Sequence, residues 1–339
     1  MKETEKDEKT LFVGIDLGTS KSAIAASNGQ KAWVESYVGW PKDFVSSKML
    51  DEEILFGKDA IDNRLSVNLY RPLQNGVIKE GSVKDRESVK ELIQHMVDLV
   101  SPSREQKVCA VIGVPSESMK VNKLAIKEAA EDTVDSLMVV PEPFAVAYDM
   151  NMISDTMVID IGAGTVDFCM MHGAIPKGDN LRTILTAGDH IDSQLHSLLE
   201  VSHSEASFNL NMVRRFKEEH SFVGKRSSVK VEMPVKGKPM DHDISDGLRE
   251  ACESILPPLV ETTVEMIAKC DPEYQEKIRK NIILAGGGSQ IDGIADYMVK
   301  ELNEYGKVNI NCVDDPLYMG AKGALALAQE MPKAYWEEI

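Results

Sequence analysis

Two short segments of this 339-residue sequence place an aspartate and a glycine directly after an apolar run. They are Ile15–Ser20 (IDLGTS) and Ile159–Gly164 (IDIGAG), and each is followed by a second apolar run, Ser22–Ala26 or Val166–Met171. The pattern predicts a strand–loop–strand hairpin in each case. Successive backbone N–H groups in such a loop can form a cradle for an anion. An aspartate at the strand end can face a divalent cation, directly or through water.

The recurrence of this unit carries more information than either copy. A single loop of this kind is also typical of a plain β-turn with a capped aspartate. Two similar units about 144 residues apart, at Asp16 and Asp160, indicate an internal repeat. The repeat predicts two lobes of like topology, each of which offers an aspartate and a glycine turn to a shared cleft.

Two further segments could act on the same ligand. Gly286–Gly288 follows the apolar run Ile282–Ala285, and three consecutive glycines let the backbone approach a flat or phosphorylated ligand closely. The alternative is a helix N-terminal turn with no ligand. Glu142 follows a short predicted strand and begins a predicted helix. From its position alone, such a glutamate complements the helix dipole.

Several common site types are not supported. The second loop lacks the last glycine of the dinucleotide fingerprint and lies between two strands, which argues against a nicotinamide site. No GxxxxGK[ST] sequence occurs, so a P-loop enzyme is rejected as well. The five cysteines form no CxxC pair and the seven histidines form no HExxH pair, so a protein-held zinc site is not expected. Ser116 lacks the GxSxG context of a serine hydrolase.

Charge and composition limit the partners and the compartment. The 55 acidic and 38 basic residues give a net charge of −17, which argues against duplex DNA or an anionic membrane as the main partner. Residues 1–10 carry seven charges and are predicted to be a disordered tail, not a signal peptide. No segment has the ~18 apolar residues of a membrane span. Scattered, unpaired cysteines are typical of the cytoplasm.

Strands alternate with helices along the chain, which predicts an α/β protein whose sheets are covered by helices. The expected strands are Leu11–Ile15, Ser22–Ala26, Lys31–Tyr37, Val108–Val114, Leu137–Val140, Thr156–Ile161, Val166–Met171 and Ile282–Ala285. The expected helices are Val83–Val100 (capped by Ser82), Lys120–Thr133, Glu142–Asp149, Asp192–Leu199, Leu248–Ala268, Ile291–Leu302 and Gly320–Gln329. The polar, turn-rich stretch Lys225–Asp243 suits a peripheral subdomain.

Taken together, the two hairpins and the glycine turn resemble the phosphate-1, phosphate-2 and adenosine motifs of the actin/Hsp70/sugar-kinase ATPase superfamily. The match in order and spacing covers nearly the whole chain. Three segments, Pro141–Ala145, Lys217–Gly224 and Tyr335–Trp336, look closest to the bacterial actins, in particular to those that organise magnetosomes. The resemblance implies an actin-like fold with two similar lobes around a nucleotide cleft. Lobe I would be 11–159 plus 315–339, with a small subdomain at about 40–82. Lobe II would be 160–314, with a small subdomain at about 200–255.

The same resemblance implies residue roles and two cofactors, ATP and Mg²⁺. Asp16 and Asp160 would hold the metal, and Glu142 would orient the attacking water, with Asp160 as its catalytic companion. The residues implied in nucleotide binding are Asp16, Gly18, Thr19, Ser20, Gly162, Ala163, Gly164, Thr165, Lys217, Glu218, Gly286, Gly287 and Gly288. Within this set Lys217 and Glu218 would flank the adenine and the ribose. Without the resemblance, this Lys–Glu pair is typical of a solvated helix face.

The implied function is that of a cytoplasmic cytoskeletal ATPase. It would polymerise with ATP and Mg²⁺, disassemble after hydrolysis, and align magnetosomes through magnetosome-associated partner proteins. By analogy, contacts between subunits would involve Trp40–Leu55 and Lys225–Asp243. The alternatives are a bacterial actin of the cell-shape or plasmid-segregation type, a monomeric small-molecule kinase of the same superfamily, and a nucleotide-gated chaperone-like module.

Overall fold

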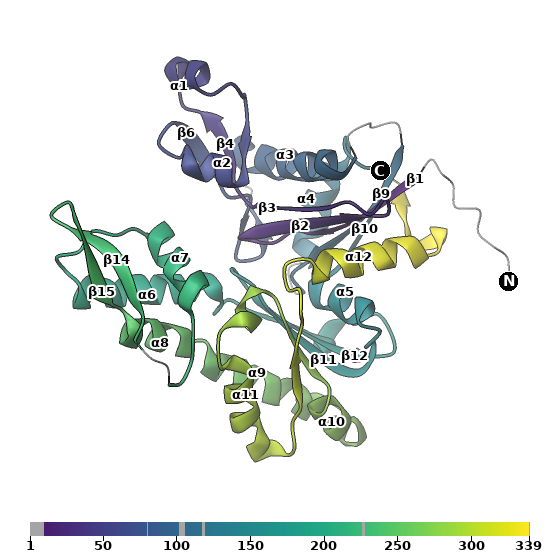
Figure 1. Ribbon diagram of the computed structural model, residues 1–339. Coiled ribbons are helices and arrows are strands. Elements are labelled where there is room, and N and C mark those ends of the chain that lie inside the picture. The colour runs from purple at the N-terminus through teal and green to yellow at the C-terminus, as the bar shows by residue number, and fades with distance from the viewer. Residues whose placement is uncertain (1–9, 80, 102–105, 117–118, 226–227, 339) are drawn as a thin grey trace. The chain divides into compact units, whose positions relative to one another are not determined.

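The computed structural model describes residues 10–79, 81–101, 106–116, 119–225 and 228–338 (Figure 1). Of the predicted tail 1–10, positions 1–9 lie outside the described residues, and Thr10 is the first residue of a strand. The chain forms two compact units. Unit 1 runs up to Ile153 and adds Ala174–Pro176 and the segment from Asp315 onward, whereas unit 2 comprises Ser154–Gly173 and Lys177–Asp314. No helix among the described residues is long and apolar enough to cross a membrane.

Unit 1 is built on a six-stranded mixed sheet with the strand order β18-β10-β9-β1-β2-β3. The strands are β1 (Thr10–Asp16), β2 (Lys21–Ala26), β3 (Lys31–Glu35), β9 (Lys107–Val114), β10 (Ser136–Pro141) and β18 (Glu337–Glu338). β1, β9 and β10 are parallel to one another, and β9 is buried along its whole length after Lys107. A strand buried on both faces requires a continuous apolar run, as its sequence has.

Helices cover both faces of this sheet (Figure 1). They are α3 (Val83–Val100), α4 (Met119–Ala130), α5 (Glu142–Asp149) and α12 (Met319–Glu330). α3 begins where the sequence predicts, since the Ser82 hydroxyl accepts a hydrogen bond from the Asp85 backbone N–H at 3.1 Å. α12 packs on β1 and α5 at very short range: a Cβ at Gly323 would lie 1.9 Å from the carbonyl oxygen of Ala145. A residue without a side chain is therefore required there.

A smaller group of elements extends unit 1 between β3 and α3. It contains β4 (Val38–Pro41), α1 (Phe44–Met49), β5 (Leu55–Phe56), α2 (Gly57–Asp62), β6 (Val67–Tyr70), β7 (Leu73–Gln74) and β8 (Val77–Ile78). The predicted strand Lys31–Tyr37 is too long, because β3 ends at Glu35. The Tyr37 N–H donates to the Glu35 carbonyl at 2.7 Å, which turns the chain into β4.

Unit 2 repeats the sheet topology of unit 1. Its five strands lie in the order β13-β12-β11-β16-β17, which matches β3-β2-β1-β9-β10 strand for strand. They are β11 (Ser154–Ile161), β12 (Val166–His172), β13 (Leu181–Ile184), β16 (Ile282–Ala285) and β17 (Ile310–Cys312). Asp16 pairs with Ala23 in unit 1 and Asp160 with Asp167 in unit 2, so even the register of the two hairpins is the same. The predicted internal repeat is therefore a structural repeat.

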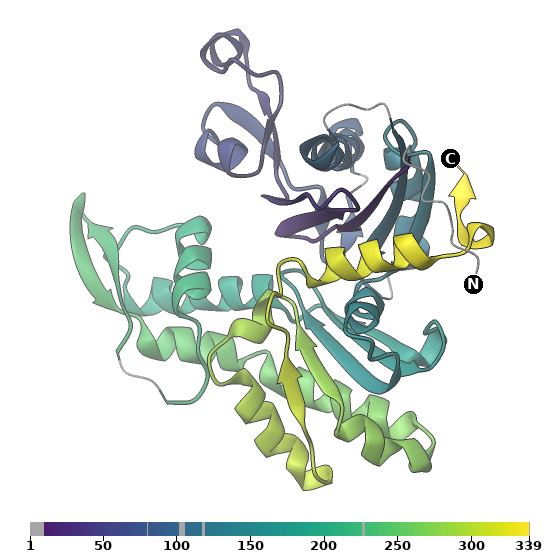
Figure 2. The same cartoon turned by 45° about the vertical axis from the view of Figure 1, so that its right-hand side comes forward.

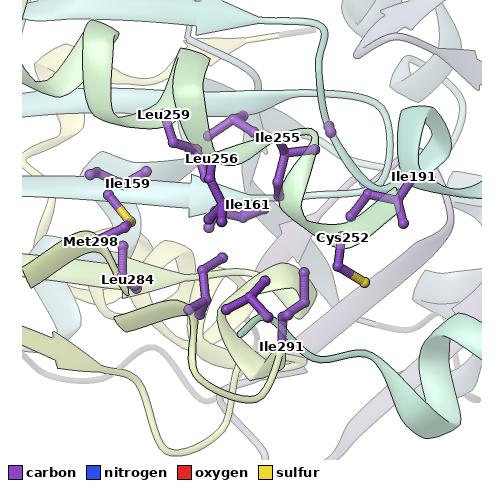
Figure 3. Close-up of a cluster of buried hydrophobic side chains, with 14 of the residues drawn as sticks. Ile159, Ile161, Ile191, Cys252, Ile255, Leu256, Leu259, Leu284, Ile291 and Met298 are labelled. Atoms are coloured by element: carbon purple, nitrogen blue, oxygen red, sulfur yellow. The ribbon is translucent and has the colours of Figure 1, made fainter. Parts of the chain in front are cut away.

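Unit 2 is covered by more helices than the sequence predicts. They are α6 (Gly188–Ser202), α7 (Leu210–His220), α8 (Ser245–Glu253), α9 (Leu256–Lys269), α10 (Pro272–Arg279) and α11 (Ile294–Leu302). The polar stretch near 225–243 forms the hairpin β14 (Lys230–Val235) and β15 (Lys238–Asp243), seen at the far left of Figure 2. The core lies between the sheet and the helices, with Ile161, Ile255 and Leu284 fully buried (Figure 3).

Several predicted helix boundaries are wrong. The expected helix Leu248–Ala268 is two helices, α8 and α9, because Pro257 and Pro258 have no backbone N–H and fit only in a first turn. The expected helix Ile291–Leu302 begins at Ile294, after a 3₁₀ turn over Gly287–Gln290. The expected helix Lys120–Thr133 ends at Ala130, and α6 is longer than Asp192–Leu199 at both ends.

The close approach of α12 gives a stability prediction. Gly323→Ala should lower the free energy of unfolding by about 1–3 kcal/mol, because the new Cβ would overlap the Ala145 carbonyl oxygen. The matched control is Gly247→Ala in α8, where a Cβ would be 3.7 Å from its nearest neighbour, Leu198. That change should be neutral or stabilise by about 0.5–1 kcal/mol. Urea unfolding measures both, and equal effects of the two changes would contradict the packing described.

Candidate functional site

The loop between β1 and β2 is held from one side by hydrogen bonds to its carbonyl oxygens. The Gly18 carbonyl accepts from the Ser36 hydroxyl at 2.6 Å, and the Thr19 carbonyl accepts from Arg71 Nε at 2.8 Å. The Ser20 carbonyl accepts from the Ser36 backbone N–H at 2.8 Å. In a trans peptide the N–H points opposite to the C=O. The N–H groups of Thr19 and Ser20 therefore each point away from the side chain that holds the adjoining carbonyl, which leaves both free of that contact to donate to an anion.

Two side-chain details complete this first loop. A Cβ at Gly18 would lie 2.2 Å from the Lys21 carbonyl oxygen, so the tight turn requires glycine. The Thr19 side chain is only 6% exposed, and its Oγ1 accepts a hydrogen bond from the Gly76 N–H at 3.3 Å. The Thr19 hydroxyl thus serves the fold, and the backbone of Thr19 is what remains for a ligand.

The loop between β11 and β12 is held in the same way by a different element. The Gly188 N–H donates to the Gly162 carbonyl at 3.1 Å, and the Asp189 N–H donates to the Ala163 carbonyl at 2.6 Å. Both donors belong to the first turn of α6, whose N–H groups have no partner within the helix. The N–H groups of Ala163 and Gly164 therefore point away from α6. Unit 2 offers a second cradle of the same kind.

In unit 1 the carboxylates of Asp16 and Glu142 stand at the carboxyl edge of the sheet. Asp16 ends β1 and pairs with Gly113 of β9. Glu142 is the first residue of α5, and a Cβ at Gly113 would lie 3.3 Å from its Cγ. One carboxylate oxygen of Glu142, Oε1, is buried. Strand carboxyl edges are where ligands bind in parallel α/β sheets.

Burial changes the acidity of Asp16. A Cβ at Gly320, in the first turn of α12, would lie 2.5 Å from Asp16 Oδ2, which shows how closely the helix covers the carboxylate. Loss of hydration raises the pKa of Asp16 to about 7. A cation near this carboxylate would stabilise its ionised form and so offset the loss of hydration.

In unit 2 the second hairpin and the triple glycine come together. Gly286 has φ = +73°, and a Cβ there would lie 2.3 Å from Asp160 Oδ1. A Cβ at Gly288 would lie 2.2 Å from the Ile161 Cγ2. At Gly287, by contrast, a Cβ would meet nothing within 4 Å. The glycine turn is therefore packed against the hairpin at Gly286 and Gly288 and is open at Gly287, where a ligand could approach the backbone.

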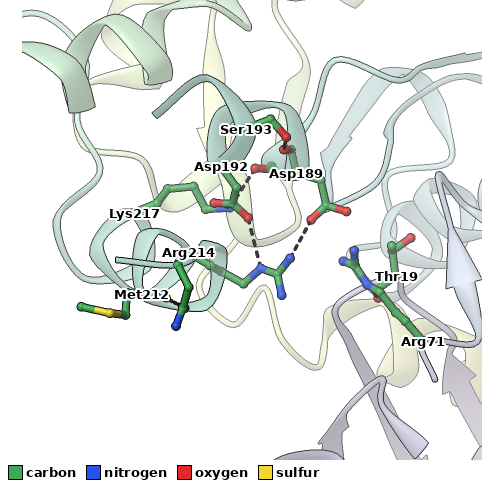
Figure 4. Close-up of polar contacts among 10 residues, drawn as sticks. Thr19, Arg71, Asp189, Asp192, Ser193, Met212, Arg214 and Lys217 are labelled. Atoms are coloured by element: carbon green, nitrogen blue, oxygen red, sulfur yellow. Dashed lines mark hydrogen bonds and ion pairs between the residues drawn. The ribbon is translucent and has the colours of Figure 1, made fainter. Parts of the chain in front are cut away.

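The structure gives Lys217 partners that the sequence does not predict. Its Nζ lies 2.7 Å from Oδ1 of Asp192 and donates to the Gly188 carbonyl at 2.9 Å (Figure 4). Arg214, one turn earlier on α7, bonds the other oxygen of Asp192 at 3.1 Å. Glu218 is exposed on α7. The sequence feature that could have indicated this cluster is that Lys217 follows Arg214 by three positions, which places both cations on one helix face.

The residues present suit a metal that is bound mainly by a ligand. Among the residues that the structure describes, no group of three or more His, Cys, Asp or Glu side chains could hold a metal ion. Mg²⁺ in nucleotide sites is typically held by one or two carboxylates together with phosphate oxygens and water. Each unit by itself offers one such carboxylate, Asp16 at the end of β1 or Asp160 next to the end of β11.

Known proteins are similar to this chain over nearly its whole length. A family model described as MreB/Mbl protein matches residues 10–335. The chain belongs to the MreB/Mbl family. Among its relatives, "Actin-like protein MamK" of Paramagnetospirillum magneticum is 38% identical over 341 residues, covering 100% of this chain and 98% of the relative. "Actin-like protein MamK" of Magnetospirillum gryphiswaldense is also 38% identical, with 100% and 95% covered.

Solved structures of family members confirm the predicted actin-like fold. A "MamK double helical filament" superposes with a TM-score of 0.92 at 37% identity, covering 95% of this chain and 100% of that one. A non-polymerising MamK mutant bound to AMPPNP gives a TM-score of 0.73 at 37% identity, with 95% and 99% covered. The resemblance to the magnetosome-organising bacterial actins is thus confirmed at the level of family and fold.

The raised pKa of Asp16 gives a prediction for the nucleotide-free protein. Because the folded-state pKa lies at about 7, above the ordinary value near 4, ionisation of Asp16 opposes folding as the pH rises between these values. Asp16→Asn should match the wild type below about pH 4 and exceed its free energy of unfolding by roughly 1–4 kcal/mol at pH 8. Urea unfolding from pH 4 to pH 8 tests this. The exposed control Asp51→Asn should follow the wild type throughout, and an Asp16→Asn difference that does not change with pH would refute the account.

Proposed function

We propose that this protein is a cytoskeletal ATPase that assembles into filaments when it binds ATP and Mg²⁺, with hydrolysis driving disassembly. The observation that carries the proposal is the pair of hairpins in identical register, each with an aspartate at the strand end and N–H groups turned to one side. The relatives support it, because they include a MamK filament and a MamK mutant bound to AMPPNP.

Each hairpin would bind phosphate through its backbone. The N–H groups of Thr19 and Ser20 in one unit, and of Ala163 and Gly164 in the other, would donate to the β- and γ-phosphates, as backbone nests do for anions. The other members of the implied set, Gly18, Gly162 and Thr165, would shape these loops. The open side of the turn at Gly287, held by Gly286 and Gly288, would approach the α-phosphate and the adenosine.

The carboxylates would divide the remaining work. Asp16 and Asp160 would hold Mg²⁺, directly or through water. Mg²⁺ supplies positive charge to the phosphate oxygens, on which charge is spread in phosphoryl transfer. Glu142, beside Gly113 at the same sheet edge as Asp16, would orient the attacking water.

The two compact units would be the two lobes of this switch. The units divide between Ile153 and Ser154, ahead of the predicted boundary at 159/160, so that β11 belongs wholly to unit 2. The predicted small subdomains, about 40–82 and about 200–255, would be the groups of elements around β4–β6 and β14–β15. Glu218, exposed on α7, would keep the predicted ribose contact.

Self-association needs a surface, and α1 offers one within the predicted contact segment Trp40–Leu55. The side chains of Phe44, Val45 and Met49 are 71%, 66% and 77% exposed, although all three are apolar. Exposed apolar side chains grouped on one element are typical of interaction sites. Exposed Met240 gives the second predicted segment, Lys225–Asp243, a similar feature. The cellular role would be to position magnetosomes in the cytoplasm through magnetosome-associated proteins, as the resemblance to magnetosome-organising actins implies.

Glu142→Gln tests the hydrolytic step. The variant keeps the size of the side chain but loses the carboxylate that would polarise water. It should still form filaments with ATP and Mg²⁺. Its rate of phosphate release should be lower than that of the wild type by a factor of about 10² or more, and its filaments should disassemble later. Sedimentation and phosphate release measure this, with exposed Glu128→Gln on α4 as the control. Release of phosphate at the wild-type rate would remove Glu142 from the mechanism.

Met49→Lys tests the contact surface. A charge in place of one of the three exposed apolar residues of α1 should prevent sedimentation with ATP. AMPPNP affinity should stay as in the wild type, because α1 is not part of either hairpin. The matched control is Leu124→Lys on α4, another exposed apolar residue, which should leave sedimentation unchanged. If wild-type protein stays in the supernatant and a sugar or small acid stimulates its turnover, the chain is instead a small-molecule kinase.

A further inference from the structure

A cluster of four charged side chains joins α6 to α7 inside unit 2 (Figure 4). Asp192 is 1% exposed, forms an ion pair with Lys217 Nζ at 2.7 Å, and accepts a hydrogen bond from Arg214 Nε at 3.1 Å. Arg214 also reaches Oδ1 of Asp189 at 3.4 Å. A buried carboxylate without a partner is costly, so Asp192 fixes the positions of both cations. α7 is thereby fastened to the first turn of α6 by charge rather than by apolar packing alone.

This cluster continues directly into the second hairpin. Lys217 donates to the Gly188 carbonyl at 2.9 Å, in the first turn of α6. The backbone N–H groups of Gly188 and Asp189 in turn donate to the carbonyls of Gly162 and Ala163. The chain of contacts therefore runs from the cations of α7, through the start of α6, to the two carbonyls that decide which way the loop N–H groups point.

We propose that Arg214 and Lys217 are positioning residues for the second phosphate-binding hairpin, and that they set its preference for a nucleoside triphosphate over a diphosphate. The inference rests on the proposed function, since it assumes that this hairpin binds phosphate. It assigns Lys217 a different task from the adenine contact that the sequence resemblance implies. With Nζ between Asp192 and the Gly188 carbonyl, Lys217 acts on the nucleotide through α6 and the loop.

The effect should depend on the number of phosphates. Hydrogen bonds weaken steeply when donor direction or distance is lost. If the cations are removed, the first turn of α6 is no longer fixed, and the N–H groups of Ala163 and Gly164 lose their common direction. In the proposed binding mode the γ-phosphate accepts hydrogen bonds from these N–H groups, so a diphosphate, which lacks it, would use fewer of them. The loss should therefore fall on the triphosphate more than on the diphosphate.

Adjacent arginines on α7 provide a matched experiment. Arg214 contacts Asp192 and Asp189, whereas Arg215 is exposed, with its guanidinium over the Phe216 ring. The affinities of full-length Arg214→Gln, Lys217→Met, the double variant and Arg215→Gln for AMPPNP and for ADP are measured with Mg²⁺ by titration calorimetry. Thermal unfolding without nucleotide reports folding. If Arg214→Gln does not fold, Asp189→Asn, which weakens the 3.4 Å contact with Arg214, takes its place.

A positioning role predicts a specific pattern. Arg214→Gln and Lys217→Met should each weaken AMPPNP binding by about tenfold and ADP binding by about twofold or less. The double variant should lose less AMPPNP affinity than the product of the two single fold-losses, because both cations act through Asp192. Arg215→Gln should bind both nucleotides as the wild type does.

Other patterns overturn the proposal in distinguishable ways. Equal losses for AMPPNP and ADP in Lys217→Met, with no loss in Arg214→Gln, would make Lys217 a direct ligand of the base or ribose. A lower unfolding temperature with unchanged affinities in both variants would reduce the cluster to a structural role. Failure of the wild type to bind AMPPNP at all would instead refute the proposed function, and this inference with it.

Discussion

In both hairpins, protein donors hold the carbonyl oxygens of the loop, and this constraint decides which way the loop N–H groups point. In unit 1 the donors are Ser36 and Arg71, and in unit 2 they are the first N–H groups of α6. Because a trans peptide fixes C=O and N–H in opposite directions, binding on one side creates a donor surface on the other. No charged side chain of the loop itself is needed, which agrees with the acidic composition of a chain that we propose binds a polyanion.

The rest of each unit can be understood as support for that surface. Equivalent five-strand arrangements place an aspartate at the start of each loop, in the same register, at the carboxyl edge of parallel strands. Neighbouring elements approach the two aspartates so closely that only glycine fits. Gly320 lies against Asp16, and Gly286 lies against Asp160. The raised pKa of Asp16 is the electrostatic consequence of this close cover.

The parts of the site that the sequence predicts are those encoded locally. Glycine after an apolar run and aspartate at the strand end are visible in six residues, and so both hairpins and the turn at Gly286 are predicted at the correct positions. The charge cluster at Asp192 is not, because it depends on α7, of which only Val213 and Phe216 are buried. Two buried apolar residues are too few to show a helical period in the sequence. Asn209 nevertheless caps this helix, since its side-chain oxygen accepts a hydrogen bond from the Met212 N–H. The short strands β4 to β6 are missed for a related reason, since two to four residues show no period.

The central question is whether the backbone N–H groups of both loops donate hydrogen bonds to phosphate. Amide hydrogen exchange of the wild-type protein, with and without AMPPNP and Mg²⁺, resolves this at the level of the loops containing Thr19 and Ser20, and Ala163 and Gly164. The nucleotide should slow exchange in both loops together, with little change in α4, which carries no proposed contact between subunits. Slower exchange in only one loop, or in neither while AMPPNP is bound, would contradict that prediction.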